Sequence, residues 1–393
     1  MGEKQVKALI VSSVYGFLSK FEKQNVELLE KMNVEVHYAS NSKNVVYEEG
    51  ESTLEELGVK YQDIPITQSL ADISANTRAI IALRKYIKKE KINIIHCHTP
   101  IGGLVARIAC MGLKDVYVIY TAHGFHFYSG ASKIRNCIYY MAEYFLSRNT
   151  NAIVTINHED ESAAKTMCAD YVYRIPGEGV DSEYYCLTDE EDKIKERIKL
   201  GIKKEDFFVI SVGEIRKNKN QKKIIETIQY FQNNNPDGQN IIYGIIGSGC
   251  KECALKKYVK QNGLENNVRF YGYEVDIRKF LRAADVMVFP SIREGLGMAP
   301  LEAMFTGLPV IASSNRGSKE YIKHEKNGLL VREDTVDAYA NAIAQMYSYK
   351  REHKRYNREK IRKSVTSFEK SESEKVMRKV YEDAFNKCTV SGL

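Results

Sequence analysis

The chain has 393 residues, of which 44% are hydrophobic and 28% are charged, as in ordinary globular proteins. This composition excludes a disordered chain, a collagen-like repeat and a small disulfide-rich protein, and the length predicts two domains, or three. The 58 lysines and arginines exceed the 51 aspartates and glutamates, and this surplus is compatible with nucleic acid, an anionic membrane or a phosphorylated substrate.

The N-terminal sequence leads directly into an apolar run, without the charged region, long apolar segment and cleavage site of a signal peptide. No apolar run reaches the roughly 20 residues that a membrane-spanning helix needs. We therefore expect a cytoplasmic protein with free cysteines. Cys250 and Cys253 form a CxxC pair, but no second pair of ligands lies nearby, and we expect no metal site.

Short apolar runs alternate with amphipathic stretches in the first part of the chain. Helical spacing of apolar residues occurs over residues 72–91 and 102–112. Because the short runs are apolar on both faces, they predict a parallel sheet covered by helices. The expected strands are residues 6–14, 34–40, 92–98, 116–122 and 151–156.

The same alternation then restarts, with a linker rich in Pro and Gly at residues 175–185 and a charged helix at 189–200. Two rounds of alternation predict an α/β protein with two doubly wound, Rossmann-like domains. The expected strands of the second round are residues 207–213, 240–247, 268–273, 285–290 and 308–314. We place the N-terminal domain at 1–185, the C-terminal domain at 186–360, and a helix at 361–393 that packs back on the N-terminal domain.

Ligands of open parallel sheets bind beyond the carboxyl ends of the strands, where the chain has several candidate residues. Gly16 follows the first strand and either admits a ligand to the backbone or serves a plain turn. His123 and His126 follow the strand 116–122, and His98 ends the strand 92–98. A histidine at this edge can bind a hydroxyl or a phosphate, and we assign that role to His123. For His98 and His126 a structural role is favoured.

The loop after the strand 207–213 is basic and precedes a helix. Arg216 and Lys219 therefore predict an anion site, with a solvated loop as the alternative. The turn Gly247–Ser248–Gly249 follows the next strand and indicates close approach to a ligand. A dinucleotide fingerprint would need a third glycine where the chain has Glu252, which disfavours a nicotinamide cofactor.

The most specific segment is PSIREGLGMAPLEAMFTGLPVIAS, residues 290–313. Glu294 lies in a strand-to-helix loop, and Glu302 lies eight positions later on the helix. Gly295 and Gly297 leave backbone amides open to an anion, and Pro300 suits a first helical turn. Such a loop can bind hydroxyl groups through carboxylates and a phosphate through amides.

These residues resemble family 4 glycosyltransferases with the GT-B fold, which have two facing Rossmann-like domains. The E-x7-E motif of Glu294 and Glu302 carries the resemblance, and HGFHF, GEIRKNKN, IGSG, VRFYGY, GLPVIAS and NGLLV follow in the family's order over almost the whole chain. The resemblance implies transfer from a nucleotide sugar, with uridine as the expected base, retention at the anomeric carbon, and no metal or other cofactor.

The resemblance also implies roles for single residues. Glu302 would hold the ribose hydroxyls, Glu294 would contact the donor sugar, and Lys219 would neutralise the diphosphate. His123 would face the sugar. The other residues that we assign to the donor are Gly16, Arg216, Gly247, Ser248, Gly249, Leu296, Gly297 and Met298.

The chain departs from the family at Glu214, where an arginine is usual, and a carboxylate cannot replace a guanidinium beside a diphosphate. Arg216 is our candidate for the missing cation. The form GExxKNKN resembles a subgroup of bacterial exopolysaccharide and capsule assembly, whose acceptor is a polyprenyl-diphosphate-linked sugar. Residues 133–148 are apolar nearly all round, and we expect a buried helix there, with contact to the inner face of the plasma membrane as the alternative.

The charge distribution fits a donor site in the second domain. Residues 1–190 hold 20 basic and 24 acidic side chains, whereas residues 191–393 hold 38 and 27. A leaving diphosphate needs such a surplus when no metal is present. The expected reaction moves a hexose or N-acetylhexosamine and needs no dedicated protein base, because the phosphate oxygen can take the acceptor's proton. The alternatives are a nucleotide-sugar epimerase and an inactive sugar-nucleotide-binding module. The sequence has no basic face interleaved with aromatic residues, so nothing in it indicates binding to nucleic acid. Because the C-terminal tail is basic, an anionic membrane surface remains an alternative partner.

Overall fold

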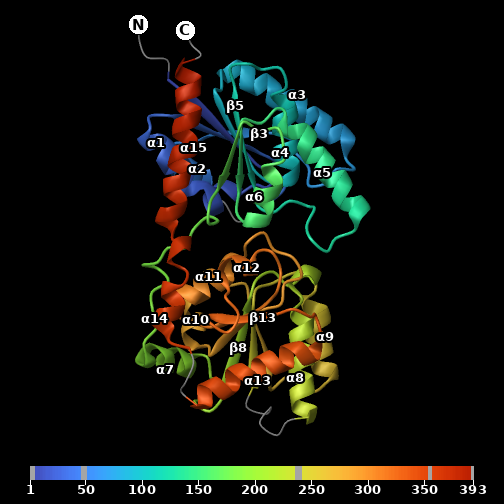
Figure 1. The fold of residues 1–393 in the computed structure, drawn as a ribbon, viewed down its shortest axis with the longest axis vertical. Coiled ribbons are helices and arrows are strands. Elements are labelled where there is room, and N and C mark those ends of the chain that lie inside the picture. Colours follow the sequence, from blue (N-terminus) through green and yellow to red (C-terminus); the bar gives the residue numbers. More distant parts are fainter. Residues whose placement is uncertain (1–4, 46–50, 235–240, 353–355, 391–393) are drawn as a thin grey trace. The chain divides into compact units, whose positions relative to one another are not determined.

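The computed structural model describes residues 5–45, 51–234, 241–352 and 356–390 (Figure 1). The chain divides into two compact units, one of Met1–Glu178 with Ser371–Leu393 and one of Gly179–Lys370. Each unit contains one parallel β-sheet with helices around it. The predicted pair of Rossmann-like α/β domains is therefore confirmed.

The first unit has a seven-stranded sheet in the order β3-β2-β1-β4-β5-β6-β7. Its middle strands are buried on both faces because they consist almost wholly of apolar residues, as in β1. The strands are β1 Lys7–Val11, β2 Glu35–Ser40, β3 Lys60–Asp63, β4 Ile94–Cys97, β5 Tyr117–Ala122, β6 Ala152–Thr155 and β7 Tyr171–Arg174. The helices are the π-helix η1 Leu18–Glu22, α1 Lys23–Lys31, α2 Glu51–Glu56, α3 Ile73–Glu90, α4 Pro100–Ala109, α5 Lys133–Ser147, α6 His158–Ala164 and α15 Lys370–Val390.

The second unit has a six-stranded sheet in the order β10-β9-β8-β11-β12-β13. Its apolar core lies between this sheet and helices such as α8 and α13. The strands are β8 Phe207–Val212, β9 Ile241–Ile246, β10 Val268–Gly272, β11 Val286–Phe289, β12 Val310–Ser313 and β13 Gly328–Val331. The helices are α7 Glu190–Lys199, η2 Lys217–Lys219, α8 Gln221–Asn234, α9 Glu252–Gln261, α10 Arg278–Ala283, α11 Met298–Phe305, α12 Ser318–Tyr321, α13 Val336–Glu352, α14 Arg358–Lys363 and η4 Thr366–Phe368.

Three strands are additional to the predicted ones. The edge strands β3 and β7 are partly exposed and each includes a charged residue, and a search for continuous apolar runs therefore passes over them. The third, β13, is an apolar strand of only four residues. All ten predicted strands are present, although the expected first residue of one, at position 240, lies outside the described residues.

The boundary between the units differs from the predicted one. The first unit ends at Glu178 and not at residue 185, because the segment 179–185 is bonded to the second unit. The Arg362 guanidinium donates hydrogen bonds to the carbonyls of Ser182 (2.7 Å), Tyr185 (2.6 Å) and Phe305 (2.6 Å). This arginine also keeps α14 in the second unit, and the chain returns to the first unit only at residue 371.

The C-terminal helix α15 packs within the first unit and begins at Lys370, nine residues after the expected start (Figure 1). The Tyr381 hydroxyl lies 2.7 Å from Nδ1 of His96 on β4. The Tyr173 hydroxyl of β7 donates to Asp383 over 2.5 Å. Two strands of the sheet thus hold this helix through polar contacts.

Helix α5 is not buried, which differs from the burial that its sequence predicts. Its apolar side chains Ile134, Ile138, Met141 and Phe145 are exposed, and only Leu146 and Ser147 at its end are buried. The exposed four recur at helical spacing and form one stripe, which is named here the α5 stripe. Within the described ranges, no helix has the length and apolar character needed to cross a membrane.

Candidate functional site

Lys219 and Glu294 meet at the carboxyl edge of the second sheet. The Lys219 ammonium nitrogen lies 2.7 Å from Glu294 Oε1, and both side chains are mostly buried, at 17% and 15% exposure. Lys219 ends η2 after β8, and Glu294 follows β11, the parallel neighbour of β8. An ammonium has three N–H donors, so this ion pair leaves donors for a second anion.

The loops that carry this pair are tied together through Asn218. The Ile292 N–H donates to the Asn218 carbonyl over 2.8 Å, and the Asn218 side-chain amide donates to the Arg293 carbonyl over 2.9 Å. Lys219 Nζ also lies 4.9 Å from the centre of the Phe289 ring. These contacts hold the ion pair in place, which is the preorganisation that an anion site needs.

The predicted turn Gly247–Ser248–Gly249 packs against the Lys219 loop. The Ser248 carbonyl accepts a hydrogen bond from the Ile215 N–H over 2.9 Å. A Cβ at Gly247 would overlap the Gly213 carbonyl oxygen, and one at Gly249 would lie 2.5 Å from that of Ile215. These two glycines are required for the close approach of two backbones.

Helix α11 begins directly beside the ion pair. Gly297 precedes it with φ +89° and, having no side chain, cannot itself cap the first amides of the helix. Leu296 is buried, Met298 is the first helical residue, and a Cβ at Gly297 would lie 2.9 Å from the Phe289 ring. The N-terminus of a helix carries partial positive charge and suits an anion.

Glu302 lies one turn further along α11 and contacts Tyr185, which the sequence analysis did not single out. Burial, and then the charge of Glu302 and a hydrogen bond with it, raise the pKa of the Tyr185 hydroxyl. Tyr185 therefore donates to the carboxylate and fixes its orientation. Tyr185 lies in a segment read only as a linker, and no pattern there marks it.

Arg216 does not enter this group of residues. Its guanidinium lies 3.2 Å from the Glu214 carboxylate, and both side chains are half exposed. A different arginine, Arg316, is buried and lies 3.4 Å from the Glu294 carbonyl through Nε. Arg316 follows β12 in a loop that the sequence analysis did not use, although its place at a strand end was the available signal.

The first unit carries Gly16 and His123, and it is described by itself. Gly16 has φ +80° between β1 and η1. His123 Nδ1 lies 3.1 Å from Glu178 Oε1, and its Nε2 lies 3.1 Å from His98 Nδ1. His98 Nδ1 in turn lies 3.4 Å from Glu22 Oε1. Both ring nitrogens of His123 thus belong to the chain Glu178–His123–His98–Glu22, named here the histidine relay.

Burial and charge set the protonation of the histidine relay. Burial raises the pKa of Glu22 to about 7, opposed in part by a hydrogen bond from Asn25. Burial alone would lower the pKa of His123, but the hydrogen bond and charge of Glu178 outweigh it, and the pKa is raised. Burial holds the pKa of His98 well below its usual value. Glu178 thus favours the charged form of His123, whereas burial favours the neutral form of His98.

Two other histidines, the predicted His126 and His96 on β4, are engaged by neighbouring side chains. His96 uses both ring nitrogens, toward Tyr381 and the Thr121 hydroxyl, each at 2.7 Å. The His126 ring packs 5.3 Å from that of Tyr139, centre to centre. Among the described residues, only Glu22, His96 and His98 have the spacing of metal ligands, but both nitrogens of His96 are already engaged. Cys250 and Cys253 are free and exposed.

Comparisons with known proteins agree with this architecture. The family "Glycosyl transferases group 1" matches residues 192–363, and "Glycosyl transferase 4-like" matches residues 8–157. The chain is 33% identical over 379 residues to the "Putative glycosyltransferase EpsD" of Bacillus subtilis, covering 95% of this chain and 96% of the relative. It is 32% identical over 278 residues to the "UDP-Gal:alpha-D-GlcNAc-diphosphoundecaprenol alpha-1,3-galactosyltransferase" of Escherichia coli, covering 68% and 70%.

Solved structures share the fold at low sequence identity. Anabaena Alr3699/HepE, crystallised with UDP-glucose, aligns with a TM-score of 0.74 at 18% identity, over 96% of this chain and 100% of that one. Sucrose-phosphate synthase of Thermosynechococcus elongatus aligns with a TM-score of 0.78 at 20% identity, over 98% and 100%. With two matched family domains and a relative that is 33% identical over 95% of this chain, the chain belongs to the group 1 glycosyltransferases of GT-B fold, with a glycosyl transferase 4-like domain at its N-terminal end.

Proposed function

We propose that this glycosyltransferase moves a hexose or an N-acetylhexosamine from a UDP-sugar to a lipid-linked saccharide in cell-surface polysaccharide synthesis. The proposed reaction retains the configuration at the anomeric carbon and uses no metal or other cofactor. The observation that carries the proposal is the Lys219–Glu294 ion pair beside the start of α11. This arrangement sets a cation and amides near a carboxylate, as a sugar diphosphate requires.

The leaving diphosphate gains negative charge as its bond to the sugar breaks. In our proposal Lys219 and the amides of Gly297 and Met298 stabilise that charge, because they are fixed before the reaction begins. Glu294 accepts hydrogen bonds from the donor sugar, and Glu302, oriented by Tyr185, accepts those of the ribose hydroxyls. A leaving phosphate oxygen takes the proton of the attacking hydroxyl, and so no dedicated base is assigned.

We also propose roles for the residues of the first unit. Gly16 would bring the backbone close to the phosphates, since glycine has no side chain in the way and tolerates the φ of +80° found here. His123 would face the sugar. Because Glu178 holds its Nδ1 and raises its pKa, His123 would act as a charged hydrogen-bond donor and not as a base.

The acceptor is proposed from one relative and from the exposed α5 stripe. The name of the Escherichia coli relative includes diphosphoundecaprenol, a lipid carrier. The α5 stripe is flanked by the basic residues Lys133, Arg135 and Arg148, and basic ends beside an apolar face suit an anionic membrane surface. We therefore place the enzyme at the inner face of the plasma membrane.

A panel of nucleotide sugars, incubated with the purified protein and lipid extract from membranes, tests the proposal. We expect nucleotide release with a UDP-sugar, dependence on the extract, and activity that survives a metal chelator. The anomeric proton signal of the product should show retention. An inverted product, or release with none of the nucleotide sugars, would overturn the proposed reaction.

A further inference from the structure

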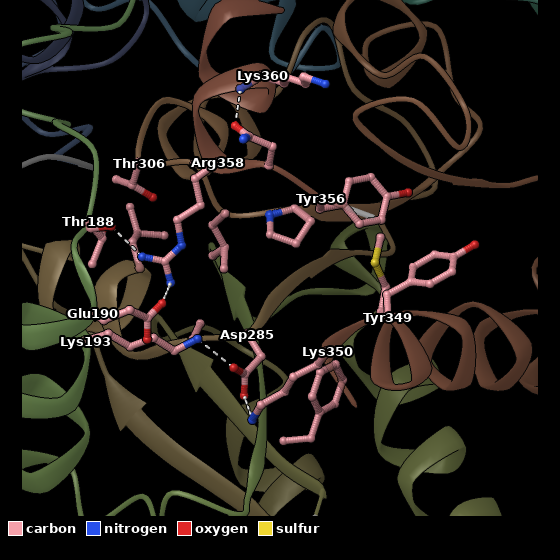
Figure 2. A pocket seen from close by; sticks show the side chains of 18 residues that line it. Thr188, Glu190, Lys193, Asp285, Thr306, Tyr349, Lys350, Tyr356, Arg358 and Lys360 are labelled. Atoms are coloured by element: carbon pink, nitrogen blue, oxygen red, sulfur yellow. Dashed lines mark hydrogen bonds and ion pairs between the residues drawn. The ribbon is translucent and has the colours of Figure 1, made fainter. Parts of the chain in front are cut away.

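The second unit contains a cavity of about 590 Å³ near the amino-terminal ends of its central strands (Figure 2). Its lining includes Phe207 at the start of β8, Asp285 just before β11, and residues 306–309 just before β12. The donor loops follow these same strands, so the cavity and the donor loops lie at opposite ends of them. Its volume falls within the roughly 300–1,000 Å³ of small-molecule sites.

One carboxylate in this cavity faces three cations. Asp285 accepts from Lys193 over 2.7 Å, from Lys350 over 3.0 Å and from Arg197 over 3.1 Å. Figure 2 shows Lys193 and Lys350 reaching Asp285 from two sides. Asp285 also accepts the Phe208 N–H over 2.9 Å. This carboxylate is saturated with donors, and it neutralises only one of the three charges.

The other residues that line the cavity do not neutralise its excess positive charge. Arg358 lies 3.5 Å from the Glu190 carboxylate and donates to the Thr188 carbonyl. Among the described residues that line the cavity, Lys193, Lys350, Arg358 and Lys360 outnumber the two carboxylates. Burial lowers the pKa of Lys193, the sign that its charge is kept there at a cost. An anion bound in the cavity would stabilise the charged form of Lys193 and so offset this cost.

Two further features of the cavity indicate which other groups a bound molecule would contact. The Thr188 hydroxyl is buried and has no hydrogen-bond partner within the described part of the chain, so a donor or acceptor is missing on that side. Figure 2 shows Tyr349 and Tyr356 across the cavity from Thr188 and Glu190. An anion with a flat or apolar group would place that group against these rings.

We propose that this cavity binds a small organic phosphate, with its phosphate at Lys350, Lys193 and Arg358 and its apolar part against Tyr349 and Tyr356. The site is distinct from the proposed donor site, because its residues precede the strands whose carboxyl ends carry the donor loops.

Calorimetric titration of the full chain with phenyl phosphate, inorganic phosphate and phenol tests the site. We expect phenyl phosphate to bind more tightly than inorganic phosphate, and phenol not to bind. Lys350→Gln should weaken phenyl phosphate binding about tenfold or more, a loss of about 1.4 kcal/mol. The variant should fold, because Asp285 keeps Lys193, Arg197 and the Phe208 N–H. Thr188→Val should weaken binding by a smaller factor.

Two control variants separate this site from other cations. Lys222→Gln removes an exposed lysine of α8, and Lys219→Ala removes the cation of the donor site; both should bind phenyl phosphate as the wild type does. Equal binding by wild type and Lys350→Gln, or no binding of either phosphate compound, would overturn the proposal. Loss of binding in Lys219→Ala would do the same, because the probe would then occupy the donor site.

Discussion

Glu294 Oε1 lies 2.7 Å from the ammonium nitrogen of Lys219, although 75 positions separate the two residues in the chain. The pairing of β8 with β11 brings their loops together, and the contacts of Asn218 hold the loops in register. These contacts hold the ion pair in a fixed position. A sugar diphosphate at this place would meet a cation already held by neighbouring groups, with little reorganisation required.

Uridine diphosphate should raise the apparent Tm of the wild-type protein. A ligand present at about 100 times its Kd stabilises the folded state by about 2.7 kcal/mol. Glu302→Ala removes the proposed ribose contact and should reduce this shift, as measured by differential scanning fluorimetry. The matched control is Glu226→Ala on α8, whose carboxylate pairs only with exposed or partly exposed lysines in the described structure. Equal shifts in both variants would contradict the role of Glu302.

Arg316 should matter more to donor affinity than Arg216. Arg316 is buried against the Glu294 loop, whereas Arg216 forms a half-exposed ion pair with Glu214. Because Arg216 is half exposed and its guanidinium is engaged by Glu214, Arg216→Ala should leave KM for the donor nearly unchanged. Arg316→Ala should raise KM by a larger factor. The reverse order in steady-state kinetics would support Arg216 as the substitute for the family's arginine.

Glu22→Gln should make unfolding less dependent on pH. The folded pKa of Glu22 is raised from 4.5 to about 7, so its stabilising contribution is complete below about pH 4.5 and is lost as the pH rises through 7. At about 1.4 kcal/mol for each pKa unit, the wild type should lose up to about 3 kcal/mol that the variant keeps.

Unfolding of both proteins by denaturant at about pH 5 and about pH 8 measures this difference. The buried histidines His96 and His98 have lowered pKa values and act in the opposite sense, so only the comparison between the two proteins isolates Glu22. A stability difference that does not grow from the lower to the higher pH would contradict the buried, raised state of Glu22.

Ile138→Glu should reduce binding to vesicles that contain anionic phosphatidylglycerol. Ile138 is exposed in the middle of the α5 stripe, so the change should leave the fold intact while placing a charge on the proposed contact face. Ile198→Glu is the control, because Ile198 of α7 is the same residue type and is also exposed. Vesicle sedimentation should separate the two variants. Wild-type binding by Ile138→Glu would exclude α5 as the contact.

The sequence was sufficient for the fold because its signals are local. Apolar runs such as Ala8–Val11 are buried on both faces, and their repeated alternation with helices leaves few architectures. The polar edge strand β3 and the exposure of α5 could not be read in this way. Both depend on which surfaces neighbouring elements happen to cover.

The candidate site was predictable in part for the same reason. Glycines and carboxylates at strand ends mark Glu294 and Gly297, because ligands bind at that edge. Tyr185, Arg316 and Glu178 were missed since each acts through a partner distant in the chain, as Tyr185 does through Glu302. No spacing rule connects such pairs. The position of Arg216 beside Glu214 likewise follows from loop geometry that a sequence pattern does not contain.

The most direct test of the central claim is the rate of nucleotide release from the preferred UDP-sugar by three variants. Lys219→Ala and Glu294→Gln should each lower kcat by about 10²–10³-fold while the proteins remain folded, because each removes a group held at the developing charge or at the sugar. Lys217→Ala, which removes an exposed lysine of the same short helix η2, should keep full activity. Wild-type rates in Lys219→Ala or Glu294→Gln would contradict the account.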